Sequence, residues 1–361
     1  MTPGILAAFV TVPVFGALMC AAPAISRPTL QFGVSIPPDH AAAPVILRER
    51  RAYYWRSAAV AICCAALGLA LALTGSGSRW LPRIVLLAEI AADAGCIYLA
   101  RRKVIAAKAS EGWLAGRRQT VVADTSWRSE PRQYPVRWLL PVVTVIAATI
   151  VIGAIRYPHL AGGLTLPDGR RASRSPLSAF IIVIGQLYVT SLWTGLLVLV
   201  YRSRPDIDPA EPAASLGRYR KLLASLARAV LVMTALIDVT FLLAALQIWQ
   251  LYRPPGFLLL LPAAAGVLIL VAAAVRAGRQ RARTSASVQQ PGRAAVVGRD
   301  DDRFWKAGLF YVNRSDPAVM VAVRIGVGWT LNLGNPASWL VVAAVIATVG
   351  GLAVLRVAAG L

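Results

Sequence analysis

The sequence is short of histidine, cysteine and acidic residues, and each shortage removes a class of function. Its 361 residues include 2 His, at His40 and His159, 4 Cys, and 16 Asp and Glu. The His-x-x-x-His and Cys-x-x-Cys spacings of zinc sites do not occur. Gly326 and Gly328 form only a fragment of a phosphate-binding loop. We therefore expect no catalytic residue, no metal and no cofactor, and predict that the chain is not an enzyme.

Charged residues are scarce in general. They make up 15 % of the sequence, whereas 57 % of the residues are hydrophobic and the mean hydropathy is +0.62. These values lie outside those of soluble domains, and a transmembrane helix needs roughly 20 apolar residues. We therefore predict an all-α membrane protein, a bundle of about eight transmembrane helices. The predicted spans are Gly4–Ile25, Ser57–Thr74, Leu81–Ala100, Trp138–Ile155, Pro176–Tyr201, Ala227–Tyr252, Phe257–Val275 and Ser338–Leu355.

The positive charge predicts the topology. The sequence has 38 Lys and Arg and a net charge of +22. Most of these residues fall in the alternate segments 26–56, 101–137, 202–226 and 276–337. Basic residues favour the cytoplasmic side, so we predict that both termini lie outside a cell membrane. Because topology accounts for the charge, we expect no nucleic-acid partner.

The first span contains an Ala22-Pro23-Ala24 pattern like a signal-peptidase site. No Lys or Arg precedes it, and cleavage would invert every later loop against the charge distribution, so we interpret the segment as a span. All four cysteines fall inside predicted helices, which indicates packing residues and no disulfide framework. The excess of Arg over Lys and the abundance of Ala suggest a bacterial source.

Two basic segments flank predicted spans. Arg48, Arg50, Arg51 and Arg56 surround the aromatic run Tyr53-Tyr54-Trp55, which is typical of an anchor at the inner headgroup level. Arg101-Arg102-Lys103 follows the third span as a stop signal. Segment 276–300 has linker composition.

A small module precedes the last span. From Asp301 the chain becomes dense in aromatic and β-branched residues, with turn signals near Pro317 and Pro336. We predict a hairpin, or a strand and a helical turn, too small to bury a core without help from the loops or the membrane face. The predicted division is a membrane domain 1–275, a cytoplasmic linker 276–300, a cytoplasmic module 301–337 and a last transmembrane helix 338–361.

Two stretches resemble families of membrane proteins. Segment 301–339 resembles the domain of unknown function 5808, through Asp302, Trp305, Gly308, Tyr311, Asn313, Asp316, Pro317, Arg324, Gly326, Gly328, Trp329, Thr330, Asn332 and Pro336. The loop after Ile155 resembles the domain of unknown function 1648, through Tyr157, Pro158, Leu160, Asp168, Gly169, Arg174 and Ser175. Such modules occur in bacterial membrane proteins similar to the immunity partner of the sporulation-delaying toxin. The resemblance implies architecture and gives no specific activity.

Three acidic residues lie inside predicted spans: Glu89, Asp93 and Asp238. Glu89 and Asp93, four residues apart, share one helix face. A carboxylate facing lipid costs at least about 2.5 kcal/mol, so all three are predicted to face the bundle interior. They could be protonated or bonded to polar residues of the fifth span (Gln186, Tyr188, Thr190, Thr194), or they could form a proton or cation path or a ligand pocket. Asp93 with Asp238 suggests an aspartyl pair by position only.

The sequence leaves two functions open. The first is a non-catalytic sensor, regulatory or immunity-type module whose C-terminal segment contacts a membrane or secreted protein or its own loops. The alternative is a proton- or cation-coupled transporter using Glu89, Asp93 and Asp238. In the C-terminal module, four aromatic residues are candidates for a ligand or partner surface or for membrane-interface anchors: Trp305, Phe310, Tyr311 and Trp329.

Overall fold

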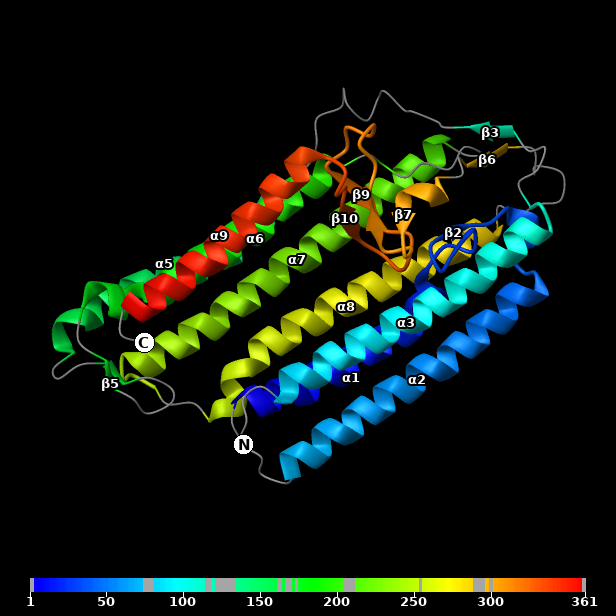
Figure 1. Cartoon of the computed structure of the whole chain (residues 1–361). Helices are drawn as coiled ribbons and strands as arrows, with labels where there is room; N and C mark the ends of the chain where they lie inside the picture. Colours follow the sequence, from blue (N-terminus) through cyan, green and yellow to red (C-terminus); the bar gives the residue numbers. More distant parts are fainter. Residues whose placement is uncertain are drawn as a thin grey trace. The chain divides into compact units, whose positions relative to one another are not determined.

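The computed structural model describes residues 3–73, 81–113, 118–120, 134–160, 164–165, 171–172, 175–203, 205, 212–252, 255–287, 296–298 and 301–358. The chain forms two compact units, each built from three stretches. Unit 1 contains Met1–Pro131, Ser203–Leu222 and Ala274–Asn335. Unit 2 contains Arg132–Arg202, Leu223–Ala273 and Pro336–Leu361. Figure 1 labels the helices and several of the strands of both units, and each unit is described by itself.

Three helices form the frame of unit 1. They are α1 (Pro3–Ile25), α2 (Pro44–Leu73) and α3 (Leu81–Ser110), and each packs against the other two. Two of them run beyond the predicted spans: α2 begins at Pro44 instead of Ser57, and α3 ends at Ser110 instead of Ala100. The additional turns are rich in Arg and Lys, which are good helix formers. They carry α2 and α3 past the apolar part of the chain.

Short strands complete unit 1. The segment between α1 and α2 forms the antiparallel hairpin β1 (Leu30–Gln31) and β2 (Val34–Ser35), followed by a 3₁₀ turn, η1 (Pro38–His40). The module before the last helix contains η4 (Asp302–Phe304) and two antiparallel pairs: β7 (Trp305–Lys306) with β8 (Phe310–Tyr311), and β9 (Met320–Ala322) with β10 (Trp329–Leu331). A parallel pair, β3 (Arg118–Thr120) with β6 (Val296–Gly298), joins distant segments.

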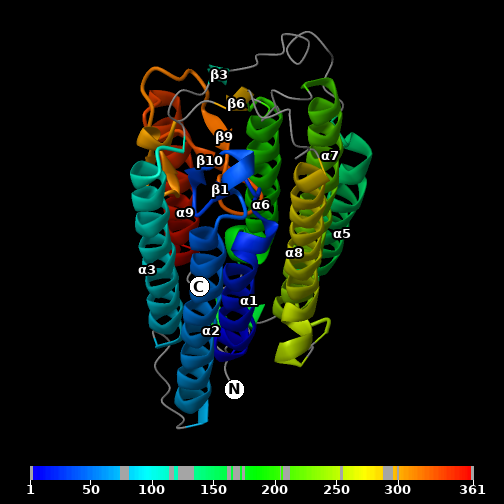
Figure 2. The ribbon, with the colours of Figure 1, turned by 90° about the vertical axis from the view of Figure 1, so that its right-hand side faces the viewer.

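The β1–β2 hairpin and helices α2 and α3 share one apolar core. Phe32, Val34 and Ile36 from the first loop are at most 2 % exposed and cluster with Tyr53 of α2 and residues of α3. Leu309 and Ile325 of the C-terminal module pack against the same cluster. Figure 2 shows β1, β9 and β10 together near one end of α1 and α2. The first loop therefore helps to bury the small module, which is one of the two arrangements that its size predicted.

Unit 2 is a bundle with one short hairpin. Its helices are α5 (Leu140–Arg156), α6 (Pro176–Tyr201), α7 (Pro212–Ile248) from Leu223 onward, α8 (Gly256–Ser287) as far as Ala273, and α9 (Pro336–Ala358). Short 3₁₀ turns, η2 (Val136–Leu139) and η3 (Tyr157–His159), flank α5, and β4 (Leu164–Thr165) pairs with β5 (Arg171–Ala172). Helix α6 packs against α5 and α9. Ser175 caps α6, accepting from Ser178 N at 3.0 Å, before Pro176 at the first turn.

Five helices in the described part of the chain are long and apolar enough to cross a membrane, and they lie in α2, α5, α6, α7 and α8. The apolar parts Phe15–Ile25 of α1 and Pro336–Gly351 of α9 are shorter. Helix α3 does not qualify, because Arg83, Glu89, Asp93 and Arg101 interrupt its apolar run. The chain is therefore a multi-pass membrane protein. The number of eight spans and the orientation of the termini stay predictions.

Segment 276–287 differs from its predicted linker character. Helix α8 continues through it to Ser287, because Arg, Gln and Ala are good helix formers and no Pro or Gly follows Gly278 there. Helix α7 likewise begins at Pro212, well before the predicted Ala227. The module contains two short strand pairs, where a single hairpin or a strand and a turn had been predicted.

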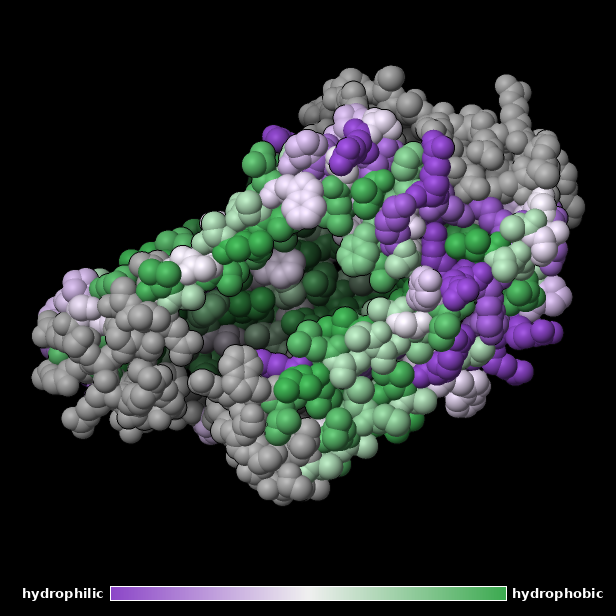
Figure 3. All heavy atoms as spheres, viewed as in Figure 1, coloured by the Kyte–Doolittle hydropathy of each residue, from purple (hydrophilic) through white to green (hydrophobic). Residues whose placement is uncertain are grey.

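The exposed side chains match the bilayer environment. Large apolar residues such as Leu87 of α3 and Leu340 of α9 are 64 % and 72 % exposed, which suits contact with lipid. Figure 3 shows hydrophobic residues along the exposed faces of α3 and α9. Hydrophilic residues gather over the adjoining ends of α2 and α3, where Arg48, Arg51 and Arg102 are exposed. This basic end is suited to anionic headgroups.

Candidate functional site

Glu89 and Asp93 are buried within the three helices of unit 1. Glu89 is 0 % exposed and Asp93 1 % exposed. Ser57 of α2 donates to Asp93 Oδ1 at 2.7 Å, and Cys20 of α1 lies 3.5 Å from the Ser57 hydroxyl as a sulfur donor. All three helices therefore contribute to the site. Sequence reasoning placed the partners of the acids on the fifth span and missed Ser57.

Glu89 has no polar partner among the described residues. Both carboxyl oxygens of Glu89, and Oδ2 of Asp93, are buried without a hydrogen bond there. The Glu89 carboxyl group lies against Gly16 of α1: a Cβ at Gly16 would stand 2.7 Å from Glu89 Oε1 and 2.5 Å from Ala61 Cβ. Glycine is thus needed at position 16 for the carboxyl group to fit. An uncompensated buried charge is costly, so this arrangement favours a neutral Glu89 or an added ligand.

Asp238 occupies a polar network in unit 2. Asp238 and Gln186 are each 0 % exposed. Thr190 of α6 donates to Asp238 Oδ2 at 3.0 Å, and Gln186 Nε2 donates to the Asp238 backbone oxygen at 2.9 Å. Gln186 Nε2 also donates to Thr149 Oγ1 of α5 at 3.0 Å. Two of the expected partners on the fifth span, Gln186 and Thr190, therefore bond Asp238.

The three acids belong to two separate sites. Glu89 and Asp93 lie in unit 1, and Asp238 lies in unit 2. All three are buried, as predicted. A common pathway that uses all three acids stays a prediction. The same holds for an aspartyl pair of Asp93 with Asp238.

Arg101 ties α3 to the small module. The sequence indicated a stop signal at this residue, yet its side chain is 6 % exposed. Its Nη1 donates to Gly33 O at 2.6 Å and to Phe32 O at 3.4 Å, and its Nη2 donates to Trp305 O at 3.2 Å. Burial lowers the pKa of Arg101, whereas the nearby Asp302 carboxylate raises it. One guanidinium therefore joins α3, the β1–β2 hairpin and β7.

Arg324 makes the matching contact from within the module. It is 5 % exposed, and its Nη1 donates to Gly33 O at 2.8 Å. It also pairs with Asp301 and Asp302 and lies over the Trp305 ring at 5.1 Å. Asp302 further accepts from Lys108 of α3 at 2.6 Å. We name Arg101, Arg324, Asp302, Lys108 and Gly33 the arginine clamp.

Asn332 organises the interior of the module. Its side chain is 0 % exposed. Its Nδ2 lies 2.9 to 3.1 Å from the backbone oxygens of Asn313, Asp316 and Ala318, and its Oδ1 accepts from the Asn313 and Gly334 amides. Tyr311 donates to Asp316 Oδ2 at 2.9 Å, while Pro317 O accepts from Asn335 at 2.9 Å. These hydrogen bonds therefore stabilise the fold of the module itself.

Two glycines and two tryptophans of the module contribute to its backbone conformation and packing. Gly326 has φ +74° and its amide donates to Ser26 Oγ of the first loop at 2.7 Å, while Gly328 has φ +148°. Such conformations favour glycine. Trp305 is 5 % exposed and packs on Tyr311, while Trp329 Nε1 donates to Tyr219 of α7 at 3.3 Å. Trp305 thus lies in the core and away from any open partner surface.

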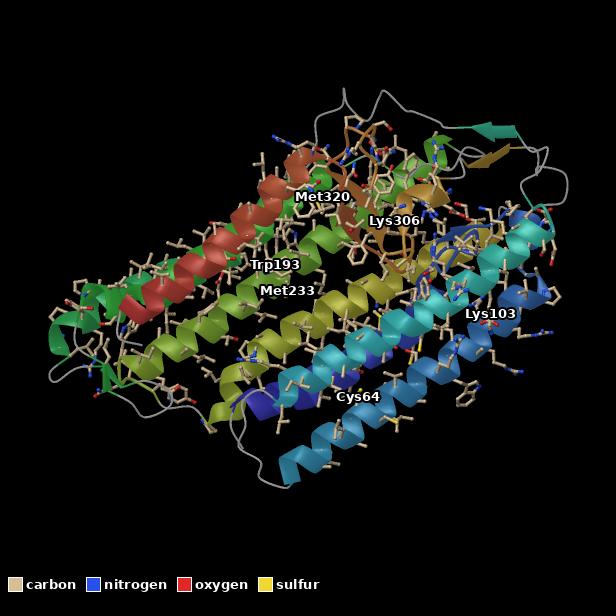
Figure 4. All side chains as sticks on the ribbon, viewed as in Figure 1. Cys64, Lys103, Trp193, Met233, Lys306 and Met320 are labelled. Carbon is tan, nitrogen blue, oxygen red and sulfur yellow. The ribbon has the colours of Figure 1, made fainter. Side chains whose placement is uncertain are left out.

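The aromatic run on α2 divides between core and surface. Tyr53 is 0 % exposed and donates to Met19 O at 2.8 Å, so it is not an interfacial anchor. Tyr54 and Trp55 are 51 % and 66 % exposed, as an anchor requires. Nearby, Glu49 is 3 % exposed and pairs with Lys103 of α3 at 2.8 Å. Figure 4 shows Lys103 between α3 and α2.

Metal-binding geometry is not found in the described residues, where no group of three or more His, Cys, Asp and Glu side chains could hold an ion. The absence of enzymatic activity stays a prediction.

Comparison with known proteins supports one of the two resemblances. Residues 314–339 match the family of unknown function DUF5808. This stretch contains Asp316, Arg324 and Asn332 of the module and extends into the start of α9. Five residues of the predicted resemblance lie outside the match: Asp302, Trp305, Gly308, Tyr311 and Asn313. No match was found to the domain of unknown function 1648, and Asp168, Gly169 and Arg174 of that loop lie outside the described residues. No curated protein and no solved structure matches the chain. The protein is a multi-pass membrane protein that contains a DUF5808 segment.

Proposed function

We propose that the protein is a non-catalytic sensor or regulatory module, of the kind found in immunity proteins, in which α3 connects a buried carboxyl pair to the C-terminal module. The observation that carries this proposal is the arginine clamp. Arg101 lies eight residues after Asp93, or about 12 Å along the helix at 1.5 Å per residue. A change in the packing of Glu89 and Asp93 would move a helix that directly holds Gly33 and Trp305.

The clamp suits a switch because its two arginines are buried and its charges depend on one another. Lys108 and Arg324 both require the Asp302 carboxylate, and Arg101 requires three carbonyl oxygens supplied by two other segments. Hydrogen bonds to charged groups contribute about 1.5 to 3 kcal/mol each. Rearranging the clamp would therefore change the stability of the module by an amount large enough to expose or cover a partner surface.

The test uses the full chain in lipid nanodiscs and follows amide exchange of residues 301–335. The double variant Glu89→Gln, Asp93→Asn should change exchange within the module. The new amide N–H groups require acceptors that this buried site does not offer in the described residues, so α3 must repack. Asp238→Asn, a comparable change in unit 2, is the matched control and should leave the module unchanged.

Arg101→Lys provides the second arm. Lysine retains a charge but has no fork of donors for three carbonyls. We expect faster exchange in the module, about tenfold for each 1.4 kcal/mol lost, and no further response to the double variant. Unchanged exchange in both variants would refute the coupling.

Unpaired acceptors favour a second candidate function, a proton- or cation-coupled transporter. Glu89 has two buried oxygens without donors in the described residues. We would measure proton uptake in proteoliposomes under an imposed pH gradient and membrane potential. Transport predicts uptake by the wild type and none by Glu89→Gln, Asp93→Asn. Equal traces with and without protein would exclude proton movement as the activity under these conditions.

A further inference from the structure

The network around Asp238 fixes the orientation of the Gln186 amide. Gln186 Nε2 lies 3.0 Å from Thr149 Oγ1 and 2.9 Å from the Asp238 backbone oxygen. The reverse orientation would place an amide oxygen against a carbonyl oxygen, which repels it. Both amide hydrogens are therefore used, and Gln186 Oε1 can only accept. It is buried and has no donor among the described residues.

Four threonine hydroxyls of this bundle have no hydrogen left to give, whereas the buried hydroxyls of Tyr188 and Thr194 bond to no described residue, Asp238 included. Thr190 donates to Asp238 Oδ2 at 3.0 Å. Thr149, Thr234 and Thr240 donate to backbone oxygens one helical turn earlier, at 2.8, 2.9 and 3.2 Å. Each hydroxyl carries one hydrogen. Asp238 Oδ1 is accordingly a second buried acceptor without a donor in the described residues.

No fixed cation in the described residues of this bundle offsets a charge on Asp238. The other titratable or charged side chains on the helices that bond Asp238 or Gln186 are Arg156 at the end of α5, Tyr188 and Tyr201 on α6, and Arg228 on the unit 2 part of α7; α8 has none as far as Ala273. Tyr134, Arg137, Tyr157, His159, Arg202 and Tyr252 lie beyond the ends of these helices. Arg228 lies about 15 Å from Asp238 along the helix. Arg156 donates to Trp249 O at 3.2 Å at the other end of the bundle.

We propose that Asp238 and Gln186 form a proton-binding site between α5, α6 and α7. A proton taken from water bonds to the Asp238 carboxylate and leaves a neutral carboxyl group with one O–H donor. That donor supplies the hydrogen that the network lacks and removes an uncompensated charge from three membrane-spanning helices. The proposal concerns unit 2 alone and is independent of the coupling to the C-terminal module.

A proton fits this site better than a metal ion. Calcium and magnesium take six or more oxygen ligands, whereas the network leaves Asp238 Oδ1 and Gln186 Oε1 as its unpaired acceptors. The described residues also contain no group of three or more His, Cys, Asp and Glu that could hold an ion.

The test is infrared difference spectroscopy of the full chain in nanodiscs, comparing acidic with alkaline buffer. We expect a carboxylic-acid C=O band that Asp238→Asn abolishes. Thr240→Val is the matched control, and the band should remain. It removes a half-buried hydroxyl on the same helix that bonds Leu236 O and Ala263 N, and that makes no bond to Asp238 or Gln186. Gln186→Leu should retain the band and shift it to higher frequency through loss of an acceptor. An identical spectrum for Asp238→Asn and wild type would overturn the proposal.

A second variant and a change of salt complete the test. If Asp238→Asn does not fold, Thr190→Val removes the donor to Oδ2 and should shift the same band; an unshifted band would overturn the assignment to Asp238. The wild type is also measured with sodium chloride in place of choline chloride. A band unaffected by sodium supports a proton site, whereas its loss in sodium would show that the occupant is the metal ion and would overturn the proposal.

Discussion

Arg101 and Arg324 donate to the same acceptor, the backbone oxygen of Gly33, at 2.6 and 2.8 Å. One guanidinium comes from a long helix and the other from a module more than two hundred residues later in the chain. Two buried cations at one carbonyl repel each other, and Asp301 and Asp302 offset this repulsion. The position of the β1–β2 hairpin therefore depends on both segments at once.

Gly33→Ala should detach the hairpin from the module. Gly33 has φ +73°, and a Cβ there would stand 2.8 Å from the Gly308 backbone. The conformation alone costs roughly 1 to 2 kcal/mol for a residue with a side chain. We expect faster protease cleavage near residues 27–40 and 301–335. Gly68→Ala is the control, since nothing lies within 4 Å of its Cβ position. Equal cleavage of the two variants would contradict the clamp.

Asp302→Asn should loosen the module with little effect on unit 2. The carboxylate pairs with Lys108 and Arg324 and accepts from Ser35 N at 3.0 Å. Removing one partner of a buried ion pair typically costs about 3 to 5 kcal/mol, and partial exposure of Asp302 places the expected loss at the lower end. Amide exchange of residues 301–335 measures it. Asp39→Asn, on an exposed carboxylate, should change little; a comparable effect there would speak against a specific role for Asp302.

Asn332→Asp should destabilise the module strongly, although the two side chains are almost the same size. The substitution keeps the acceptor for the Asn313 and Gly334 amides but replaces donors to three backbone oxygens with a charged oxygen. We expect a loss of at least about 2 kcal/mol, seen as exposure of Trp305 to fluorescence quenchers. Asn335→Asp changes the exposed bond from Asn335 Nδ2 to Pro317 O and is the matched control. Equal quenching in both would refute the assigned role.

Gly16→Ala should separate α1 from α2 and α3. Its Cβ would overlap Ala61 Cβ at 2.5 Å and Glu89 Oε1 at 2.7 Å, so either the helices or the carboxyl group must move. A cysteine cross-link between Cys20 and a cysteine introduced at Ser57 should form less readily, because these side chains are 3.5 Å apart in the wild type. Gly95→Ala on α3, with nothing within 4 Å, should leave the cross-link unchanged.

Several features followed from local sequence signals. Apolar runs predicted the helices, and the change in composition at Asp301 marked the module. The cost of a buried charge predicted that Glu89, Asp93 and Asp238 avoid lipid, and all three are buried. Thr190 was one of four residues of the fifth span named as possible partners of these acids, and it bonds Asp238.

Other partners could not be derived in this way. Ser57 begins a predicted span and carries no signal that it binds Asp93, since the contact depends on how α2 and α3 are aligned. Tyr53 and Arg101 looked like membrane-interface residues because their neighbours are basic and aromatic, yet both side chains are buried. Local composition gives the environment of a segment and does not give the direction of an individual side chain.

The sequence by itself determined that this is a helical, multi-pass membrane protein with a small C-terminal module, because hydrophobic length and charge act locally along the chain. The tertiary structure alone decided which polar groups meet: Ser57 with Asp93, Gln186 with Asp238, and two arginines at Gly33. These contacts join residues far apart in the chain. They form because buried polar groups require partners, and the packing of the helices determines which partners are within reach.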